Sequence, residues 1–171
     1  MVGTNQRASI QMSPAEITEF LTRSRVATLA TNGPHGTPHL VAMWYGYLDG
    51  KIYFETKTKS QKAVNLRRDP HLTCMVEAGD TYDQLRGVSV EGTAHLITDS
   101  GDEEYWAAGV SVYERYNGPF AEQDRPMLEM MLNKRVIVRV EPTRVRSWDH
   151  RKLGLPAMPI TGSTQPFLRG T

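Results

Sequence analysis

Short apolar stretches separated by turn residues are the feature that most limits what this chain can fold into. The stretches rich in β-branched and aromatic residues predict strands at residues 25–31, 38–47, 51–55, 71–77, 88–97 and 135–140. Turn signals stand between them, as at Asn32 to Pro34 and at Asp49-Gly50. Residues 145–148 are expected to continue the pairing of the last strand beyond Pro142. Such a series of hairpins favours a small antiparallel barrel, because closing a sheet removes its exposed edges.

Helical spacing is limited to a few segments before or between these strands. The first helix is predicted to begin at Ser13, because Pro14 and Glu16 complete a helix N-terminal signal. A longer helix is expected over residues 102–116 and a short one over residues 126–132. The chain is therefore predicted to be mainly β with flanking helices, an α+β fold built on an antiparallel barrel.

Composition excludes several classes of partner. A formal net charge of +1 supplies no strong field that would attract nucleic acid or a membrane surface. No run approaches the roughly 18 apolar residues that a membrane helix requires. Cys74 is the only cysteine in the sequence, which excludes an intrachain disulfide. The N-terminus also lacks a basic-then-apolar secretion signal, so we expect a cytoplasmic protein without nucleic-acid or stable membrane partners.

The length of 171 residues suits a single domain with a sizeable core. Residues 1–12 are mostly polar and precede the first helix signal, so we expect them to form a flexible N-terminal arm. The folded domain is expected to span residues 13–153. Residues 154–171 are rich in proline, glycine and threonine and lack a periodic pattern, so we expect an irregular C-terminal tail.

Residues 52–66 change from a strand pattern to a helix pattern within a few positions. The strand part begins with the β-branched and aromatic residues Ile52 to Phe54. Thr58 is predicted to be the N-cap of the following helix, with Gln61 three positions later completing a capping box. Asp69-Pro70 is predicted to end that helix.

The start of this helix gathers positive charge and hydroxyl groups. The lysines are Lys57, Lys59 and Lys62, and the hydroxyls belong to Thr56, Thr58 and Ser60. A helix N-terminus adds free N–H groups and the positive end of the helix dipole. The combination is typical of a phosphate cradle, and a solvated lysine-rich turn is the alternative explanation.

Four segments within residues 13–150 share their pattern with one known superfamily. They are 25–31 with 36–41, 52–56 leading to 60–62, 65–70, and 90–94. Together they resemble the split β-barrel flavin and deazaflavin proteins, the superfamily that contains pyridoxamine 5′-phosphate oxidase. The resemblance implies a split antiparallel β-barrel, a cofactor phosphate held by the segment from 52 to 62, and a homodimer with the cofactor in the groove between subunits.

Within that superfamily the run Ser60 to Asn65 is especially similar to the actinobacterial oxidoreductases that use coenzyme F420, a deazaflavin. The C-terminal region 145–152 contains arginines, a histidine and Trp148. It lacks the order of the Arg-Leu-His segment with which pyridoxamine phosphate oxidases hold substrate phosphate. The resemblance implies that Trp148 reaches the cofactor ring of the partner protomer, and an exposed tail end is the alternative.

The resemblance also implies which residues hold the cofactor. The anchor for its phosphate would be Thr56, Lys57, Thr58, Ser60, Gln61 and Lys62. The slot for its ring would be the strand from His39 to Trp44, with His39, Val41, Ala42, Met43 and Trp44 as contacts. Alternate strand residues share a face, so Val41 and Met43 lie together. The alternative places Val41 and Met43 in the core and Trp44 inside the barrel, and no side chain is implied as catalytic.

Three function classes follow from these patterns. The first is an F420-dependent oxidoreductase that transfers a hydride between the reduced cofactor and a small organic substrate. The second is an enzyme of the same fold that uses flavin mononucleotide (FMN), since the lysine anchor suits either cofactor. The third is a non-enzymatic cofactor carrier or a haem-binding protein, for which His39 or His150 is a candidate axial ligand. The five histidines lack metal-site spacing, so no metal is expected.

Overall fold

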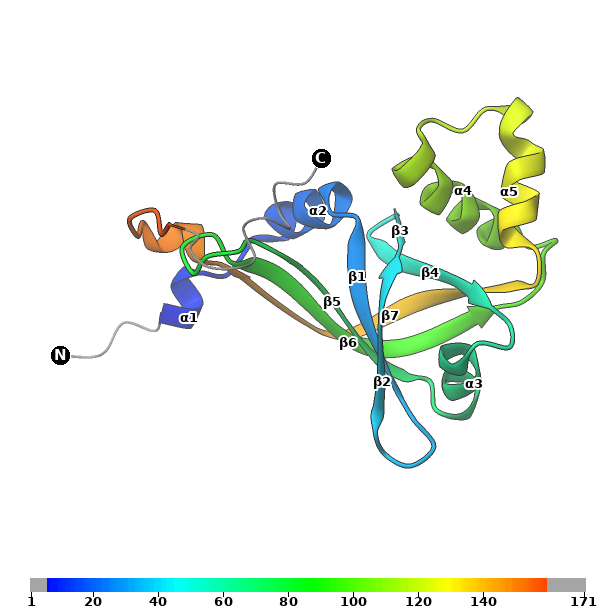
Figure 1. The fold of residues 1–171 in the computed structure, drawn as a ribbon, viewed down its shortest axis with the longest axis horizontal. Helices are drawn as coiled ribbons and strands as arrows, with labels where there is room; N and C mark the ends of the chain where they lie inside the picture. Colours follow the sequence, from blue (N-terminus) through cyan, green and yellow to red (C-terminus); the bar gives the residue numbers. More distant parts are fainter. Residues whose placement is uncertain (1–5, 160–171) are drawn as a thin grey trace.

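The computed structural model describes residues 6–159, and one curled antiparallel sheet organises that part of the chain (Figure 1). Its strands are β1 (Val26–Asn32), β2 (Pro38–Trp44), β3 (Gly46–Leu48), β4 (Lys51–Lys57), β5 (His71–Ala78), β6 (Arg86–Ile97) and β7 (Arg135–Asp149). Within the described residues these seven strands follow the order β2-β1-β5-β6-β7-β4-β3, and every neighbouring pair is antiparallel. The predicted split antiparallel β-barrel with flanking helices is confirmed.

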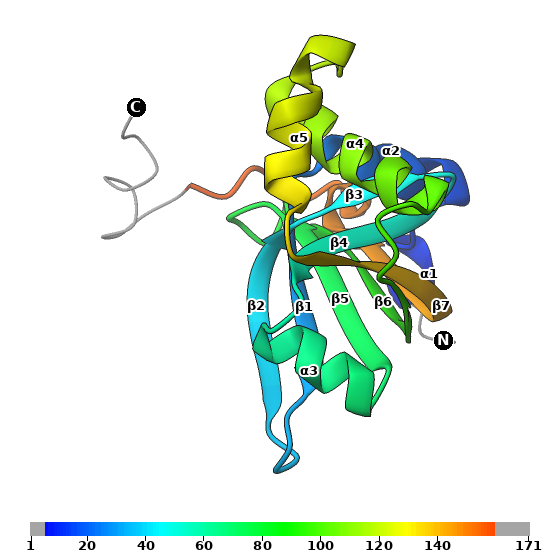
Figure 2. The same ribbon diagram turned by 90° about the vertical axis from the view of Figure 1, so that its right-hand side faces the viewer.

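The helices lie outside the sheet (Figure 2). They are α1 (Gln6–Ser9), α2 (Pro14–Arg23), α3 (Gln61–Arg68), α4 (Glu103–Asn117) and α5 (Arg125–Leu132), with short 3-10 turns at Glu122–Asp124 and His150–Leu153. The predicted start of α2 is confirmed, because Ser13 and Glu16 form a reciprocal capping box. In the part of the chain described here, no helix combines the length and apolarity needed to cross a membrane.

The sequence predicts one strand over residues 38–47, but the structure divides it at Tyr45. The part before Tyr45 pairs with β1, whereas the part after it pairs with β4 at the opposite end of the strand order. Tyr45 is fully buried, and its hydroxyl donates to the Leu21 carbonyl at 2.6 Å. The chain therefore passes directly from one edge of the sheet to the other at this residue.

Two apolar clusters hold the fold together, one on each side of β4. Phe54 packs inside the barrel with residues of β1, β5, β6 and β7. Tyr53 points the other way and packs with Tyr105, Leu128 and Ile137 beneath α4 and α5. Because strand residues alternate between faces, β4 is buried on both sides over most of its length. The polar residues near the end of β4, Glu55 and Thr56, are therefore buried as well.

The longest strand, β7, joins the two halves of the sheet. Its first part pairs with β4, and residues 137–149 pair with β6. The pairing continues past Pro142, which lies opposite Gly92 at a register shift, so the predicted continuation over residues 145–148 is confirmed. Proline is tolerated there because the ladder is already interrupted.

The described parts of the termini run along the end of β7. The Asp149 N–H donates to the Ile10 carbonyl at 2.7 Å, and the Met12 N–H donates to the Ser147 hydroxyl at 3.0 Å. Residues 154–159 contain neither helix nor strand, and the Met158 N–H donates to Asp83 Oδ1 at 3.3 Å. The remaining parts of the expected arm and tail, residues 1–5 and 160–171, lie outside the described residues.

Candidate functional site

A cavity of about 350 Å³ lies at the seam of the barrel, between β2 and β4. Strand β3 pairs only with residues 51–53 of β4, so residues 54–57 have no sheet neighbour on that side. Strand β2 is likewise an edge, since β1 is its only partner among the described strands. The seam cavity is lined by Val41, Ala42, Met43, Trp44, Glu55, Thr56, Lys62, Met131 and Arg135. It thus brings four residues of the predicted ring slot together with Thr56 and Lys62 of the predicted anchor.

Strand β2 presents two different faces along the seam. His39, Val41 and Met43 are half-buried, whereas the alternate residues are exposed. Trp44 is 53% exposed, and its ring stacks on Tyr116 with centroids 3.9 Å apart. The alternative that Trp44 fills the barrel is therefore wrong. Val41 and Met43 do pack against the core cluster, and they also line the seam cavity.

His39 lies two residues before Val41 on β2 and is not part of the cavity lining. Its Nδ1 atom is buried and has no hydrogen-bond partner within residues 6–159. The other candidate haem ligand, His150, has its Nδ1 atom 2.9 Å from the Tyr82 carbonyl oxygen. The two histidines belong to opposite ends of the chain, on β2 and on the turn after β7.

The start of α3 differs from the prediction in one respect. The N-cap is Ser60, whose hydroxyl accepts from the Ala63 N–H at 3.4 Å, and not Thr58. The Thr58 N–H instead donates to the Lys134 carbonyl at 3.0 Å, which ties this loop to the turn before β7. A further turn, closed by the Ser60 N–H on the Lys57 carbonyl, delays the helix start. The predicted helix end is confirmed, with Asp69 as the C-cap.

The anchor residues separate into those inside the cavity and those outside it. The Thr56 and Ser60 hydroxyl oxygens lie 3.0 Å apart, so Ser60 adjoins the cavity wall. The Gln61 side chain turns along the helix and donates to Asn65 Oδ1 at 2.8 Å. Lys57 is exposed and is not part of the lining. Thr58 instead lines a neighbouring cavity of about 820 Å³ beneath α4 and α5.

Three residues of the seam cavity were not predicted, namely Glu55, Met131 and Arg135. Arg135 Nη1 lies 3.8 Å from Glu55 Oε1, and Arg135 Nε donates to the Met131 carbonyl at 2.6 Å. Burial raises the pKa of Glu55, and the nearby Arg135 charge partly opposes this rise. Burial lowers the pKa of Lys62, and the Arg135 charge lowers it further. Two cationic side chains and one buried carboxyl therefore share the cavity.

Trp148 lies far from the seam cavity within its own chain. It stands opposite Gly87, and its ring is so close that a Cβ at position 87 would lie 2.4 Å from Cζ2. It is 13 residues beyond Arg135 on the same strand, which corresponds to roughly 40 Å along β7. The structure therefore does not bring Trp148 to the other predicted site residues of this chain.

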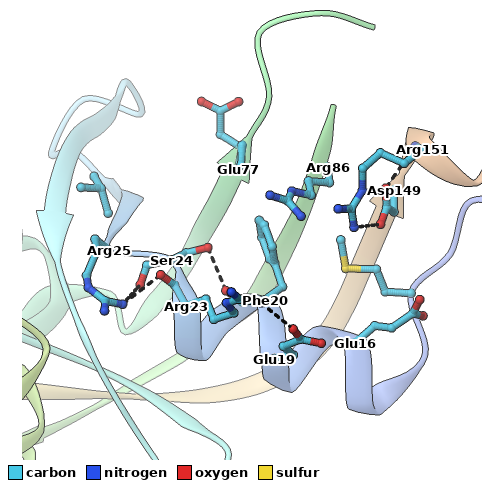
Figure 3. Close-up of a pocket in the computed structure, with 13 residues that line it drawn as sticks. Glu16, Glu19, Phe20, Arg23, Ser24, Arg25, Glu77, Arg86, Asp149 and Arg151 are labelled. Atoms are coloured by element: carbon cyan, nitrogen blue, oxygen red, sulfur yellow. Dashed lines mark hydrogen bonds and ion pairs between the residues drawn. The ribbon is translucent and has the colours of Figure 1, made fainter. Parts of the chain in front are cut away.

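A third cavity, of about 690 Å³, lies between α2 and the ends of β5, β6 and β7 (Figure 3). Two ion pairs lie within its lining. Arg23 pairs with Glu19 at 2.9 Å, and Arg151 Nε donates to Asp149 Oδ1 at 2.8 Å. Arg86 lies over the Phe20 ring at 5.6 Å. The seam cavity differs because its Glu55 Oε2 atom has no partner in the described residues.

The seam cavity combines apolar and cationic side chains. Val41, Met43 and Met131 are the apolar residues, and Lys62 and Arg135 supply positive charge. The unpaired edges of β2 and β4 leave main-chain groups free to hydrogen-bond a flat ring. The arrangement can hold an elongated ligand with a planar ring at β2 and an anionic group near α3.

Comparison with solved structures places the chain among known proteins of this fold. The conserved hypothetical protein Rv2991 from Mycobacterium tuberculosis is 58% identical, over 94% of this chain and 99% of that one, with a TM-score of 0.89. A structure described as an F420 reductase is 29% identical, over 78% of this chain and 98% of that one, with a TM-score of 0.59. HutZ, a haem storage protein from Vibrio cholerae, is 17% identical over 77% of this chain and 92% of that one, with a TM-score of 0.62, and shares the fold alone.

The family comparison covers most of the described chain. The model of the pyridoxamine 5′-phosphate oxidase family matches residues 13–149, from the N-cap of α2 to the last residue of β7. The match includes both strands of the seam and the whole of α3. This chain therefore belongs to the pyridoxamine 5′-phosphate oxidase family.

Proposed function

We propose that this protein is an oxidoreductase that binds coenzyme F420 and transfers a hydride between the reduced cofactor and a small organic substrate. The observation that carries the proposal is the seam cavity, which joins an apolar edge strand to the cationic pair Lys62 and Arg135. The run Ser60 to Asn65 and the likeness to an F420 reductase favour F420 over flavin.

Different residues of the cavity would bind the phosphate and the ring of the cofactor. Lys62 and the hydroxyls of Thr56 and Ser60 would hold the phosphate, together with the free N–H groups at the start of α3. The outer edge of β2 would hydrogen-bond the rim of the ring, while Val41, Met43 and Met131 exclude water from its face. F420 supplies the hydride when bound, so the protein has to orient ring and substrate rather than provide an acid or base.

We also propose that the working unit is a homodimer. Trp148 cannot reach the seam cavity of its own chain, so its contribution to a cofactor site requires a second copy. The β1–β2 hairpin carries Val26, Leu40 and Trp44, which are 48%, 62% and 53% exposed. Val26 and Trp44 are direct partners across the hairpin, which makes the apolar surface continuous. Covering it with a second copy fits an interface that buries more than about 2,000 Å².

The decisive experiment is equilibrium titration of the purified protein with F420, FMN and haem separately, followed by absorption and fluorescence. F420 is expected to bind most tightly. Lys62→Ala is expected to weaken F420 binding by about 1–3 kcal/mol, the scale of a hydrogen bond to a charged group. Lys57→Ala is the matched control, because Lys57 is exposed and outside the cavity, and its effect should be smaller and more salt-sensitive.

Two results would reject the assignment. Tighter binding of FMN, or copurification of a flavin, would make this an FMN protein of the same family. Tight haem binding that disappears in His39→Ala would support the non-enzymatic alternative, because His39 Nδ1 is the buried ring nitrogen without a partner in the described residues.

A further inference from the structure

Glu55 is the acidic side chain that lines the seam cavity among the described residues. The residue is 9% exposed, its Oε2 atom is buried without a hydrogen-bond partner in residues 6–159, and its Oε1 atom lies 3.8 Å from Arg135 Nη1. A buried carboxyl with one unpaired oxygen is costly, because the protein replaces none of the lost hydration at that atom. Such a group calls for a role beyond packing.

Two neighbouring elements place cationic side chains beside Glu55, whereas the lining residues of β2 and α5 are uncharged. Arg135 belongs to β7 and Lys62 to α3, and both line the cavity. Tyr105 of α4 interacts electrostatically with Glu55: burial raises the pKa of its phenol, and the Glu55 charge raises it further. Lys57 and Lys59 lie further out and are exposed, so solvent screens their charges. Counted as formal charges, the two cationic side chains and the one carboxylate of the lining sum to +1.

The contact between Glu55 and Arg135 is loose enough to be exchanged. At 3.8 Å it exceeds the usual length of a charge-assisted hydrogen bond. Arg135 is instead fixed through Nε, which donates to the Met131 carbonyl, so its terminal nitrogens remain beside the cavity. An anionic ligand that enters the cavity therefore competes with Glu55 for the same guanidinium group.

We propose that Glu55 sets the ligand charge that this site accepts, favouring a singly charged phosphodiester over a doubly charged phosphomonoester. A diester carries one negative charge, which matches the net +1 of the lining. A monoester carries close to two at neutral pH. Binding it draws Arg135 from Glu55, and the site then takes a proton from solvent onto the Glu55 carboxylate.

This inference rests on the phosphate-binding part of the proposed function and names the ligand class within it. The phosphate of F420 is a diester, whereas that of FMN is a monoester. Glu55 thereby provides a physical reason for one cofactor over the other that does not depend on the ring. Replacing the carboxylate by a neutral amide of the same shape removes the discrimination and retains the cavity.

The test uses two ligands that share one ring, FMN and its monomethyl phosphate ester. Dissociation constants are measured by flavin fluorescence at pH 7.5 and low salt for the parent protein, Glu55→Gln and the control Glu77→Gln. Glu77 is an exposed carboxylate outside the seam cavity. The parent should bind the methyl ester more tightly than FMN. Glu55→Gln should strengthen FMN binding by about tenfold, the scale of one nearby charge, and ester binding by less.

A second measurement needs no variant. Calorimetric titration of the parent with FMN, in two buffers of different ionisation enthalpy, should show net proton uptake, and titration with the methyl ester should not. Any of four results would overturn the proposal. Two concern the variants: equal effects of Glu55→Gln on both ligands, or an effect matched by Glu77→Gln. The other two concern the parent: absence of proton uptake with FMN, or failure to bind either ligand. F420 takes no part in the test, so failure to bind F420 would reject the proposed function without deciding this one.

Discussion

The hydroxyl oxygens of Thr56 and Ser60 lie 3.0 Å apart, although one belongs to the end of a strand and the other caps a helix. The contact closes a short loop whose middle residue, Thr58, is bonded to the turn before β7. Three elements of the fold are thereby held together at one end of the seam cavity. The loop between β4 and α3 is fixed before any ligand arrives, which lowers the entropic cost of binding an anion there.

Replacing the cap of α3 should affect stability at position 60 and not at position 58. Ser60→Ala removes the side chain that accepts from the Ala63 N–H, and loss of an N-cap costs about 1 kcal/mol of unfolding free energy. Thr58→Ala removes a hydroxyl that does not cap the helix, so its cost should be clearly smaller. Urea unfolding of both variants measures the difference. An equal or larger loss in Thr58→Ala would contradict the observed helix start.

Adding a methyl group at Gly87 should destabilise the protein through Trp148. The new Cβ would lie 2.4 Å from the indole ring, and relieving such overpacking costs about 1–3 kcal/mol. Gly87→Ala should lower the melting temperature, and a second change, Trp148→Ala, should recover part of the loss. A double-mutant cycle of melting experiments measures the coupling. Strictly additive effects would show that the two residues do not press on each other.

The proposed homodimer gives Trp148 a separate test. We expect the protein to sediment as a dimer at micromolar concentration and to bind cofactor at two equivalent sites. Trp148→Ala should weaken cofactor binding and leave the sedimentation coefficient unchanged, because the exposed apolar residues of the β1–β2 hairpin are intact. A monomer that binds cofactor at full affinity would refute the shared site. Unchanged affinity in Trp148→Ala would exclude Trp148 from the cofactor site and would leave the proposed homodimer standing.

Asp69 should make the protein sensitive to acid. Its pKa is lowered to about 2, chiefly because the Asn32 side chain donates to Oδ2 at 2.8 Å and also because His71 contacts Oδ1. A folded-state pKa below the unfolded value of about 3.9 means stabilisation that is complete above that pH and lost as pH falls toward 2. Asp69→Asn should flatten this part of the curve of melting temperature against pH. The exposed loop variant Asp80→Asn is the control and should follow the parent.

Local signals in the sequence were sufficient for most of the fold. The capping box at Ser13 and Glu16 and the Asp49-Gly50 turn each depend on residues within four positions, and both are present. The strand that contains β2 was predicted from its own composition, which is also a local signal, whereas its role as the ring slot came from the resemblance to the superfamily. Such features can be predicted from a few neighbouring residues, because the interactions that cause them are local in sequence.

What the sequence did not reveal depends on pairing between distant segments. Tyr45 interrupts a run of strand-forming residues with no turn signal, because what breaks the strand is a buried contact with Leu21. Glu55 and Arg135 reach the same cavity only through the pairing of β4 with β7, about 80 positions apart in sequence. The Lys57↔Arg135 register could have been inferred only after that pairing was known.

The passage of the chain across the seam at Tyr45 also affects the order of folding. Strands β3 and β4 are made before β5 and β6, yet within the described residues they are hydrogen-bonded to the rest of the sheet only through β7. Until residues 135–149 have been synthesised, no strand pairing described here joins the β3–β4 hairpin to the four strands β2, β1, β5 and β6. Unpaired strand edges of this kind favour aggregation of nascent chains. The last strand to be made therefore closes the barrel, and a ribosome that stalls before it leaves a chain with two open sheets.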